Sequence, residues 1–174
     1  MFKIIAIAIA VVIAALLVYA AFQPDTFRVE RSIGIKAPPE KIHALIEDLR
    51  AMQTWSAWEK VDPGMKRAHS GAARGVGAVY EWEGNNDIGQ GRMEITGSSP
   101  SRVVIRMDFI KPFAAQNTLE LTLQPEGDAT RVTEAISGPA PYISKLLGIF
   151  YSMDKMIGGK FEESLAGLKT VAEQ

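Results

Sequence analysis

The sequence predicts an α+β fold, in which a curved antiparallel sheet surrounds a long C-terminal helix and is preceded by one transmembrane helix. Three observations predict this fold. The chain has an uncharged apolar run from Ile4 to Phe22. Its middle alternates apolar and polar residues in segments separated by Gly- and Pro-containing turns, which is typical of an antiparallel meander. Its last part repeats apolar residues at intervals of three or four, as a helix does, and a sheet curved around that helix would bury both apolar surfaces.

The apolar run is predicted to be a retained membrane anchor. At about 1.5 Å per residue it forms roughly 28 Å of helix, which nearly matches a hydrocarbon core of about 30 Å. A cleaved signal peptide is the alternative, because Lys3 supplies a positive charge and Val18–Ala20 resembles a cleavage site. The apolar region of a signal peptide is, however, usually only about 7–15 residues long. A buried core helix fits poorly, because the run is apolar on every face.

The sequence leaves open which side of the membrane the following domain faces. Arg28, Arg31 and Lys36 favour a cytoplasmic domain, whereas the short tail before the run is typical of an uncleaved export signal. The chain has no cysteine, which fits either compartment and excludes disulfides and thiolate metal sites. A net charge of −1 without a basic block argues against nucleic-acid binding.

Residues 1–25 are predicted to be the anchor with a short exit, and residues 26–174 to be one domain large enough for a sizeable core. The first strand is predicted from alternating apolar residues, namely Phe27, Val29, Ile33 and Ile35. A helix is predicted after Pro38–Pro39, since proline is tolerated in a first turn. Its apolar face consists of Ile42, Leu45, Ile46 and Leu49.

Five further strands are predicted, each ending at a turn signal. They are Val76–Glu83, Gln90–Thr96, Val103–Ile110, Asn117–Gln124 and Thr130–Ser137. From Tyr142 onward the pattern is helical, with an interruption at Gly158–Gly159. A glycine costs about 1 kcal/mol relative to alanine inside a helix, so we expect a kink or close packing there.

Three segments together resemble the opening of the SRPBCC or START-like superfamily, in its polyketide cyclase/dehydrase-like branch. They are Ile33–Ile42, Leu45–Leu49 and the tryptophan pair Trp55–Trp58. The resemblance covers about residues 27–171. It implies a helix-grip fold, in which the sheet grips the C-terminal helix around a hydrophobic cavity. Members of the superfamily bind lipids, polyketides, sterols and other apolar molecules, and only some of them are enzymes.

The alternation along the strands predicts one continuous apolar face opposite the terminal helix. The simplest interpretation of this face is an ordinary hydrophobic core. Large aromatic and flexible methionine side chains also suit a cavity for varied apolar ligands. The residues predicted to contact a ligand are Trp55, Trp58, Tyr80, Trp82, Met93, Met107, Phe109, Asn117, Glu134, Phe150 and Met153.

Three polar residues fall on this apolar face: Arg31, Asn117 and Glu134. A buried isolated charge is costly, so each needs water, a partner or a ligand. They could lie at strand ends in water. Arg31 and Glu134 could form an ion pair, because the resembled fold makes the first and last strands neighbours. Glu134 could instead orient a ligand or act as an acid or base, and it stands where related sequences often carry an aromatic residue.

No catalytic residue, cofactor or metal is predicted. His43 is expected at the surface, and His69 at a strand edge within residues 66–70. The spacing of the histidines is not that of a metal site, and Gly71–Gly77 lacks the lysine of a phosphate loop, so a turn is expected there. The carboxylates of Glu59, Asp62 and Asp87 are expected to be solvated.

The function predicted is a membrane-tethered module that binds a hydrophobic small molecule or lipid in an internal cavity. Its tether favours capture or handover of the ligand close to the bilayer. One alternative is a cyclase, dehydratase or hydrolase-like enzyme that uses Glu134, His69 or Asn117 on an apolar substrate. Another is a module whose grip is filled by its own side chains and which serves a protein partner that the sequence does not identify.

Overall fold

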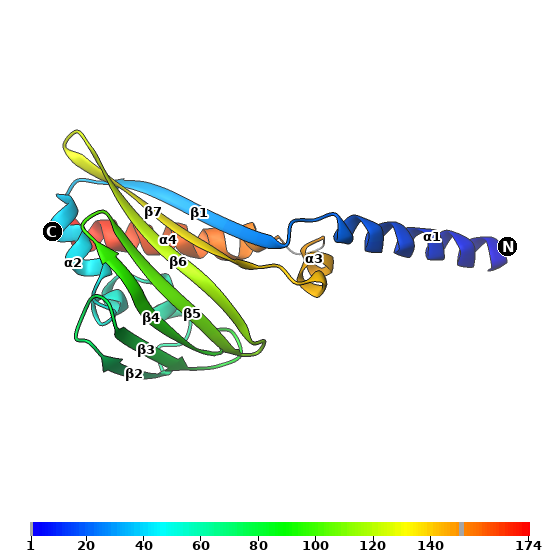
Figure 1. The fold of residues 1–174 in the computed structure, drawn as a ribbon, viewed down its shortest axis with the longest axis horizontal. Coiled ribbons are helices and arrows are strands. Elements are labelled where there is room, and N and C mark those ends of the chain that lie inside the picture. The colour runs from blue at the N-terminus through cyan, green and yellow to red at the C-terminus, as the bar shows by residue number, and fades with distance from the viewer. Residues whose placement is uncertain (1, 150–151) are drawn as a thin grey trace.

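A computed structural model describes residues 2–149 and 152–174 of the chain. One antiparallel sheet of seven strands has the order β1-β7-β6-β5-β4-β3-β2 (Figure 1). The strands are β1 (Thr26–Ile35), β2 (Lys66–Gly71), β3 (Ala78–Glu83), β4 (Gln90–Ser99), β5 (Arg102–Lys111), β6 (Ala115–Glu126) and β7 (Ala129–Pro139). The helices are α1 (Phe2–Ala21), α2 (Pro39–Ile46), α3 (Tyr142–Gly148) and α4 (Met153–Ala172), with the short 3-10 helices η1 (Ala51–Thr54) and η2 (Ala57–Lys60).

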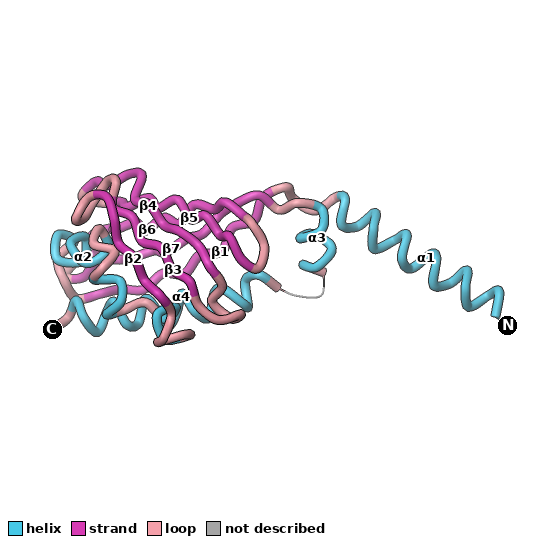
Figure 2. Tube along the Cα trace, turned by 90° about the horizontal axis from the view of Figure 1, so that it is seen from below, coloured by secondary structure: helices cyan, strands magenta, loops and turns pink. Residues whose placement is uncertain are grey.

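The predicted α+β fold is confirmed: the curved sheet packs against the long helix α4, and α1 extends away from the domain (Figures 1 and 2). The alternating residues sort as expected between the two faces of the sheet. On the outer face, Arg106 Nη2 lies 2.7 Å from Glu94 Oε2 on the adjacent strand. Exposed pairs of this kind add little stability. Their presence keeps this face in water and leaves the apolar face to form the core with α2 and α4.

The C-terminal region differs from the prediction of one helical segment interrupted at Gly158–Gly159. The structure has two helices, α3 ending at Gly148 and α4 beginning at Met153, where the Ser152 hydroxyl caps the first turn by accepting from the Lys155 amide. Both glycines lie inside α4, and the close packing that was one of the two expectations occurs at Gly158. A Cβ on Gly158 would lie only 2.1 Å from Nη2 of Arg31, which passes beneath the helix.

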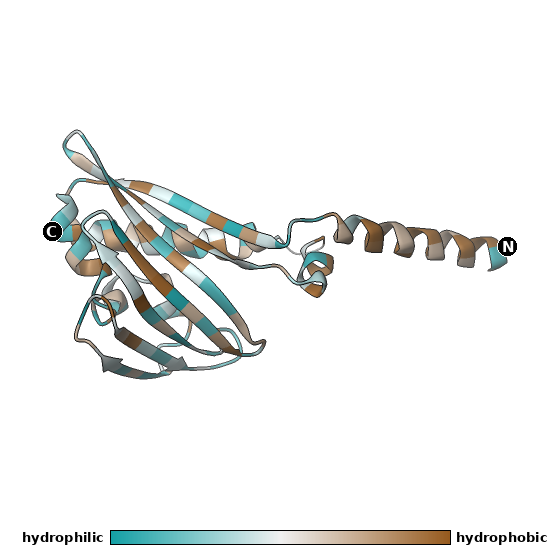
Figure 3. Cartoon of the chain, in the orientation of Figure 1, coloured by the Kyte–Doolittle hydropathy of each residue, from teal (hydrophilic) through white to brown (hydrophobic). Residues whose placement is uncertain are grey.

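Helix α1 is exposed on nearly all sides and is brown to pale in the hydropathy colouring of Figure 3, apart from a teal patch near the N-terminus. Within the described residues, it alone is long and apolar enough to cross a membrane, a property that signal sequences share. Helix α3 packs beside its last turns (Figures 1 and 2). The Tyr142 hydroxyl donates to the Leu17 carbonyl at 2.8 Å. The Lys145 ammonium, on a side chain only 7% exposed, lies 2.5 Å from Asp25 and lowers the pKa of that carboxyl through this hydrogen bond.

One end of the sheet therefore lies next to α1. Because β1 begins there at Thr26 and the strands are antiparallel, the turn from β3 to β4 and the turn from β5 to β6 lie at the same end. The start of α4 lies there as well (Figure 1). The glycine-containing turn at Gly71–Gly77, which was predicted correctly, lies at the opposite end, and Gly71, Gly75 and Gly77 have positive φ angles.

Candidate ligand-binding cavity

A cavity of about 330 Å³ lies between the inner face of the sheet, η1–η2 and α4. Its walls are almost entirely apolar. The lining residues are Met52, Trp55, Ser56, Trp58, Glu59, Met65, Tyr80, Trp82, Asp87, Ile88, Met93, Met107, Phe109, Lys111, Pro112, Leu119, Glu134, Ile136, Met153, Met156, Ile157 and Phe161. Ligand pockets span roughly 300–1,000 Å³, so this volume suits a single compact molecule.

The residues predicted to contact a ligand come largely together around this cavity. Those that line it are Trp55, Trp58, Tyr80, Trp82, Met93, Met107, Phe109, Glu134 and Met153. Asn117 is buried on β6 but is not a lining residue, and its amide lies against Gly138 of β7. Phe150 lies outside the described residues. Binding of a ligand by any of these side chains stays a prediction.

Trp82 shows how local sequence shapes the wall. Its indole nitrogen donates to the Ile88 carbonyl at 3.2 Å, which ties β3 to the turn that follows it. A Cβ on Gly91, its neighbour on β4, would lie 2.4 Å from the indole ring. Glycine at position 91 therefore lets the indole lie flat against the sheet. Phe109 meets the same ring edge-on, with ring centres 5.9 Å apart.

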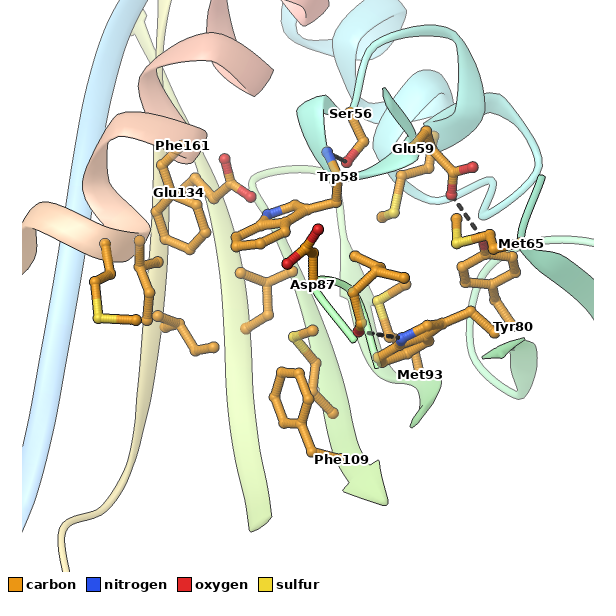
Figure 4. A pocket seen from close by; sticks show the side chains of 18 of the residues that line it. Ser56, Trp58, Glu59, Met65, Tyr80, Asp87, Met93, Phe109, Glu134 and Phe161 are labelled. Atoms are coloured by element: carbon orange, nitrogen blue, oxygen red, sulfur yellow. Dashed lines mark hydrogen bonds between the residues drawn. The ribbon is translucent and has the colours of Figure 1, made fainter. Parts of the chain in front are cut away.

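Glu134 is the most deeply buried charged residue type of the wall. Its side chain points from β7 into the space below α4, beside Phe161 and Trp58 (Figure 4). It is 3% exposed, and its Oε2 has no hydrogen-bond partner in the described structure. Burial without a charge partner raises the pKa of Glu134 to about 8. The prediction that this residue could lie at a strand end in water is wrong.

The predicted ion pair between Arg31 and Glu134 is also wrong, although the two residues are direct neighbours across β1 and β7. The Arg31 guanidinium turns to α4 instead. Its Nε donates to Glu162 at 2.7 Å, and Nη1 and Nη2 donate to Asp154 at 2.8 and 3.0 Å. Two carboxylates one turn to either side of Gly158 thus neutralise the cation that stands opposite Glu134.

Glu59 corrects another prediction, because its side chain is only 9% exposed rather than solvated. Arg67 Nε donates to Oε2 at 2.7 Å and the Tyr80 hydroxyl donates to Oε1 at 2.6 Å. Burial and the neighbouring Glu59 carboxylate raise the pKa of the Tyr80 phenol, and the hydrogen bond to Glu59 raises the pKa of Arg67. Glu59 and Tyr80 lie across the pocket from Glu134 (Figure 4).

The remaining candidate residues lie away from the cavity or at its mouth. His69 is on the edge strand β2, as predicted, with its ring centre 4.9 Å from that of Tyr80. His43 is partly buried rather than at the surface, 3.1 Å from the Ser98 hydroxyl. Asp62 accepts amide hydrogens in the turns near Gly64 and Asn85, and Asp87 is exposed at the mouth. Within residues 2–149 and 152–174, no group of three His, Asp or Glu side chains could hold a metal ion.

Several lining residues were not singled out as ligand contacts from the sequence. On the sheet these include Leu119 and Ile136, and on α4 they include Ile157 and Phe161. Leu119 and Ile136 share the strand face of Asn117 and Glu134, and Ile157 and Phe161 belong to the apolar stripe of the terminal helix. The signals were therefore present, but they could not separate cavity wall from filled core.

The chain belongs to the polyketide cyclase / dehydrase and lipid transport family, whose sequence model matches residues 26–173. The resemblance to the SRPBCC or START-like superfamily is thereby confirmed. None of the curated protein sequences matches the chain.

Solved structures share the fold. Protein CV1439 from Chromobacterium violaceum has a TM-score of 0.60 at 17% identity, covering 87% of this chain and 99% of that one. The di-domain ARO/CYC StfQ from the steffimycin biosynthetic pathway has a TM-score of 0.64 at 10% identity, and the match covers 85% of this chain and 51% of that one. Major latex-like protein 151 from Panax ginseng has a TM-score of 0.59 at 14% identity, covering 87% and 100%. At these identities the likeness concerns the fold alone.

Proposed function

We propose that this protein is a membrane-tethered module that binds one hydrophobic small molecule or lipid inside its cavity. The observation that carries the proposal is the apolar cavity of about 330 Å³ between the sheet and α4. A well-packed core has few voids larger than a water molecule. Space of this size with apolar walls therefore favours a ligand over a grip filled by the protein's own side chains, and family membership supports the same function.

The mouth of the cavity supports the membrane part of the proposal. Asp87, Lys111, Pro112 and Met156 line the cavity from the turns and the helix start at the end of the sheet next to α1. Exposed apolar side chains gather at this same end, in the β5–β6 turn and on α3, and they include Phe113, Ile143 and Leu147. If α1 spans the bilayer as residues 1–25 were predicted to do, the mouth of domain 26–174 opens toward the membrane surface. A ligand dissolved in the bilayer would then enter over a short path.

The experiment is mass spectrometry of apolar molecules that co-purify with the full chain extracted in detergent. Wild type is expected to carry a bound species at a stoichiometry approaching one. Met107→Trp places a larger side chain in the cavity and should abolish this species, because the added volume occupies the ligand's place. Val104→Trp, on the outer face of the same strand, should retain it. Equal retention by both variants, with both folded, would contradict the proposal.

The tether is tested on the same preparations. A retained anchor keeps the full-length mass in the membrane fraction after an alkaline carbonate wash. A shortened, soluble chain that lacks the apolar run would instead identify it as a cleaved signal.

A further inference from the structure

We propose that the cavity selects apolar molecules whose single polar group donates a hydrogen bond, a primary amine above all, and that Glu134 accepts it. This inference rests on the proposed ligand-binding function and names the class of ligand. Four features of the described residues carry it.

The first feature is the carboxyl itself. A buried polar atom without a partner is rare in folded proteins and costly to keep. Glu134 Oε2 is such an atom, in a side chain that is 3% exposed and lines an apolar cavity. No requirement of the sheet explains it, because strand pairing uses only the backbone of this residue. A donor that arrives with a ligand would satisfy the oxygen.

The second feature is the loss of the internal partner. Arg31 stands directly opposite Glu134 in the sheet and would be the natural cation for it. Its guanidinium is instead held by hydrogen bonds to Asp154 and Glu162, in the space that Gly158 leaves open. Reaching Glu134 would require these bonds to break. The fold thus neutralises Arg31 on α4 and keeps Glu134 free for a ligand.

The third feature is that the other buried polar groups of the wall are occupied. The Glu59 carboxylate receives both Arg67 and the Tyr80 hydroxyl. The Ser56 hydroxyl oxygen accepts from the Trp58 amide at 3.3 Å. Among the described lining residues, Glu134 is therefore the one with a buried side-chain atom lacking a partner. A ligand's polar group would be directed to this point.

The fourth feature is the sign of the charges. Apart from Lys111 at the mouth, the charged residues of the described lining are the carboxylates Glu59, Asp87 and Glu134. Arg67 already neutralises Glu59, so Glu134 is the carboxyl that a polar group inside the cavity would meet. An ammonium group would favour ionisation of Glu134 and pair with the carboxylate, whereas an anionic head group would oppose that ionisation. Ionic hydrogen bonds are roughly twice as strong as neutral ones. An amine should therefore bind more tightly than an alcohol with the same chain, and a carboxylate should bind least.

The test compares decylamine, decanol and decanoate on the full chain in detergent micelles. The reporters are Trp55, Trp58 and Trp82, which are all the tryptophans of the chain and all line the cavity. Wild type should bind decylamine about tenfold or more tightly than decanoate, with decanol between them. Glu134→Gln should weaken decylamine by about tenfold and change decanol by less than about threefold. Glu81→Gln, the matched control on the exposed outer face of β3, should leave decylamine within about threefold.

The outcomes separate the two proposals. Equal binding of the three probes by wild type, or an unchanged ranking in Glu134→Gln, would overturn the selection of donors while leaving a ligand-binding cavity in place. Absence of any tryptophan response, together with no co-purifying species, would overturn the proposed function itself. Should the glutamine variant fold poorly, Glu134→Leu removes the carboxyl within an apolar wall and must show the same selective loss of decylamine.

Discussion

At the scale of single residues, Glu134 dominates the physical chemistry of the domain. Its partnerless burial raises its pKa from an ordinary 4.5 to about 8. Between these two pH values the folded protein keeps a proton that the unfolded chain has released. The folded state therefore binds more protons, and its stability must decrease as the pH rises through this window.

Replacing the Glu134 carboxyl should remove its contribution to the pH dependence of the free energy of unfolding. Relative to Glu134→Gln, the wild type should lose stability from pH 5 to pH 8 by up to about 1.4 kcal/mol per pH unit. Chemical denaturation of both proteins in detergent at several pH values measures the difference. Because the comparison is between two proteins, carboxylates with lowered pKa values, such as Asp25 and Asp154, cancel. Parallel stability curves for the two proteins would contradict the assignment.

At the scale of elements, the contact between β1 and α4 depends on one glycine. Gly158 leaves room for the Arg31 guanidinium, whereas a Cβ on its neighbour Gly159 would meet nothing within 4 Å. Arg31 reaches Asp154 and Glu162 on either side of this gap, and these partners raise the pKa of the guanidinium further. The two adjacent glycines of α4 thus have different roles.

Alanine at the two positions should separate these roles. Gly159→Ala should stabilise the protein by up to about 1 kcal/mol, because alanine favours helix and the position is open. Gly158→Ala should fall short of that gain or destabilise the protein, because its Cβ displaces Arg31. Thermal unfolding of both variants measures the contrast. In an Arg31→Ala background the two alanine substitutions should become equivalent, and a persisting difference would mean that Arg31 is not the cause.

The same elements show what the sequence could and could not predict. Strands with strict alternation, such as β6, were found to within a few residues, because one buried and one wet face leave a period of two. The division between α3 and α4 was missed, since apolar residues continue at helical spacing on both sides of it. The partner of Arg31 and the burial of Glu59 were missed for another reason. Both depend on how distant segments pack, and periodicity carries no information about that.

At the scale of the whole molecule, the cavity mouth, α3 and α1 gather at one end. Phe113, in the β5–β6 turn there, is 81% exposed. Such exposure of a large aromatic side chain at the end of the sheet where a proposed membrane anchor begins favours contact with the bilayer surface.

A charge at this position should slow ligand uptake without weakening binding. Phe113→Asp in reconstituted vesicles should delay tryptophan quenching by a brominated decanol roughly tenfold, because an apolar contact worth about 1.5–3 kcal/mol is lost. Affinity in detergent should be unchanged. Val76→Asp provides the control, because Val76 is 59% exposed in the turn at the opposite end of the sheet. Equal uptake rates for wild type and both variants would contradict entry from the membrane.

The short connection between α1 and the domain limits the distance between the cavity and the end of α1. Only residues 22–25 separate the last residue of α1 from β1, and an extended chain spans at most about 3.6 Å per residue. The contacts of Tyr142 and Lys145 with Leu17 and Asp25 hold this connection on a further element. With α1 in a bilayer, the domain would stay at that membrane surface and could not diffuse between membranes as a soluble carrier does. A ligand that leaves the cavity for another membrane would therefore need a separate carrier that comes to the tethered domain.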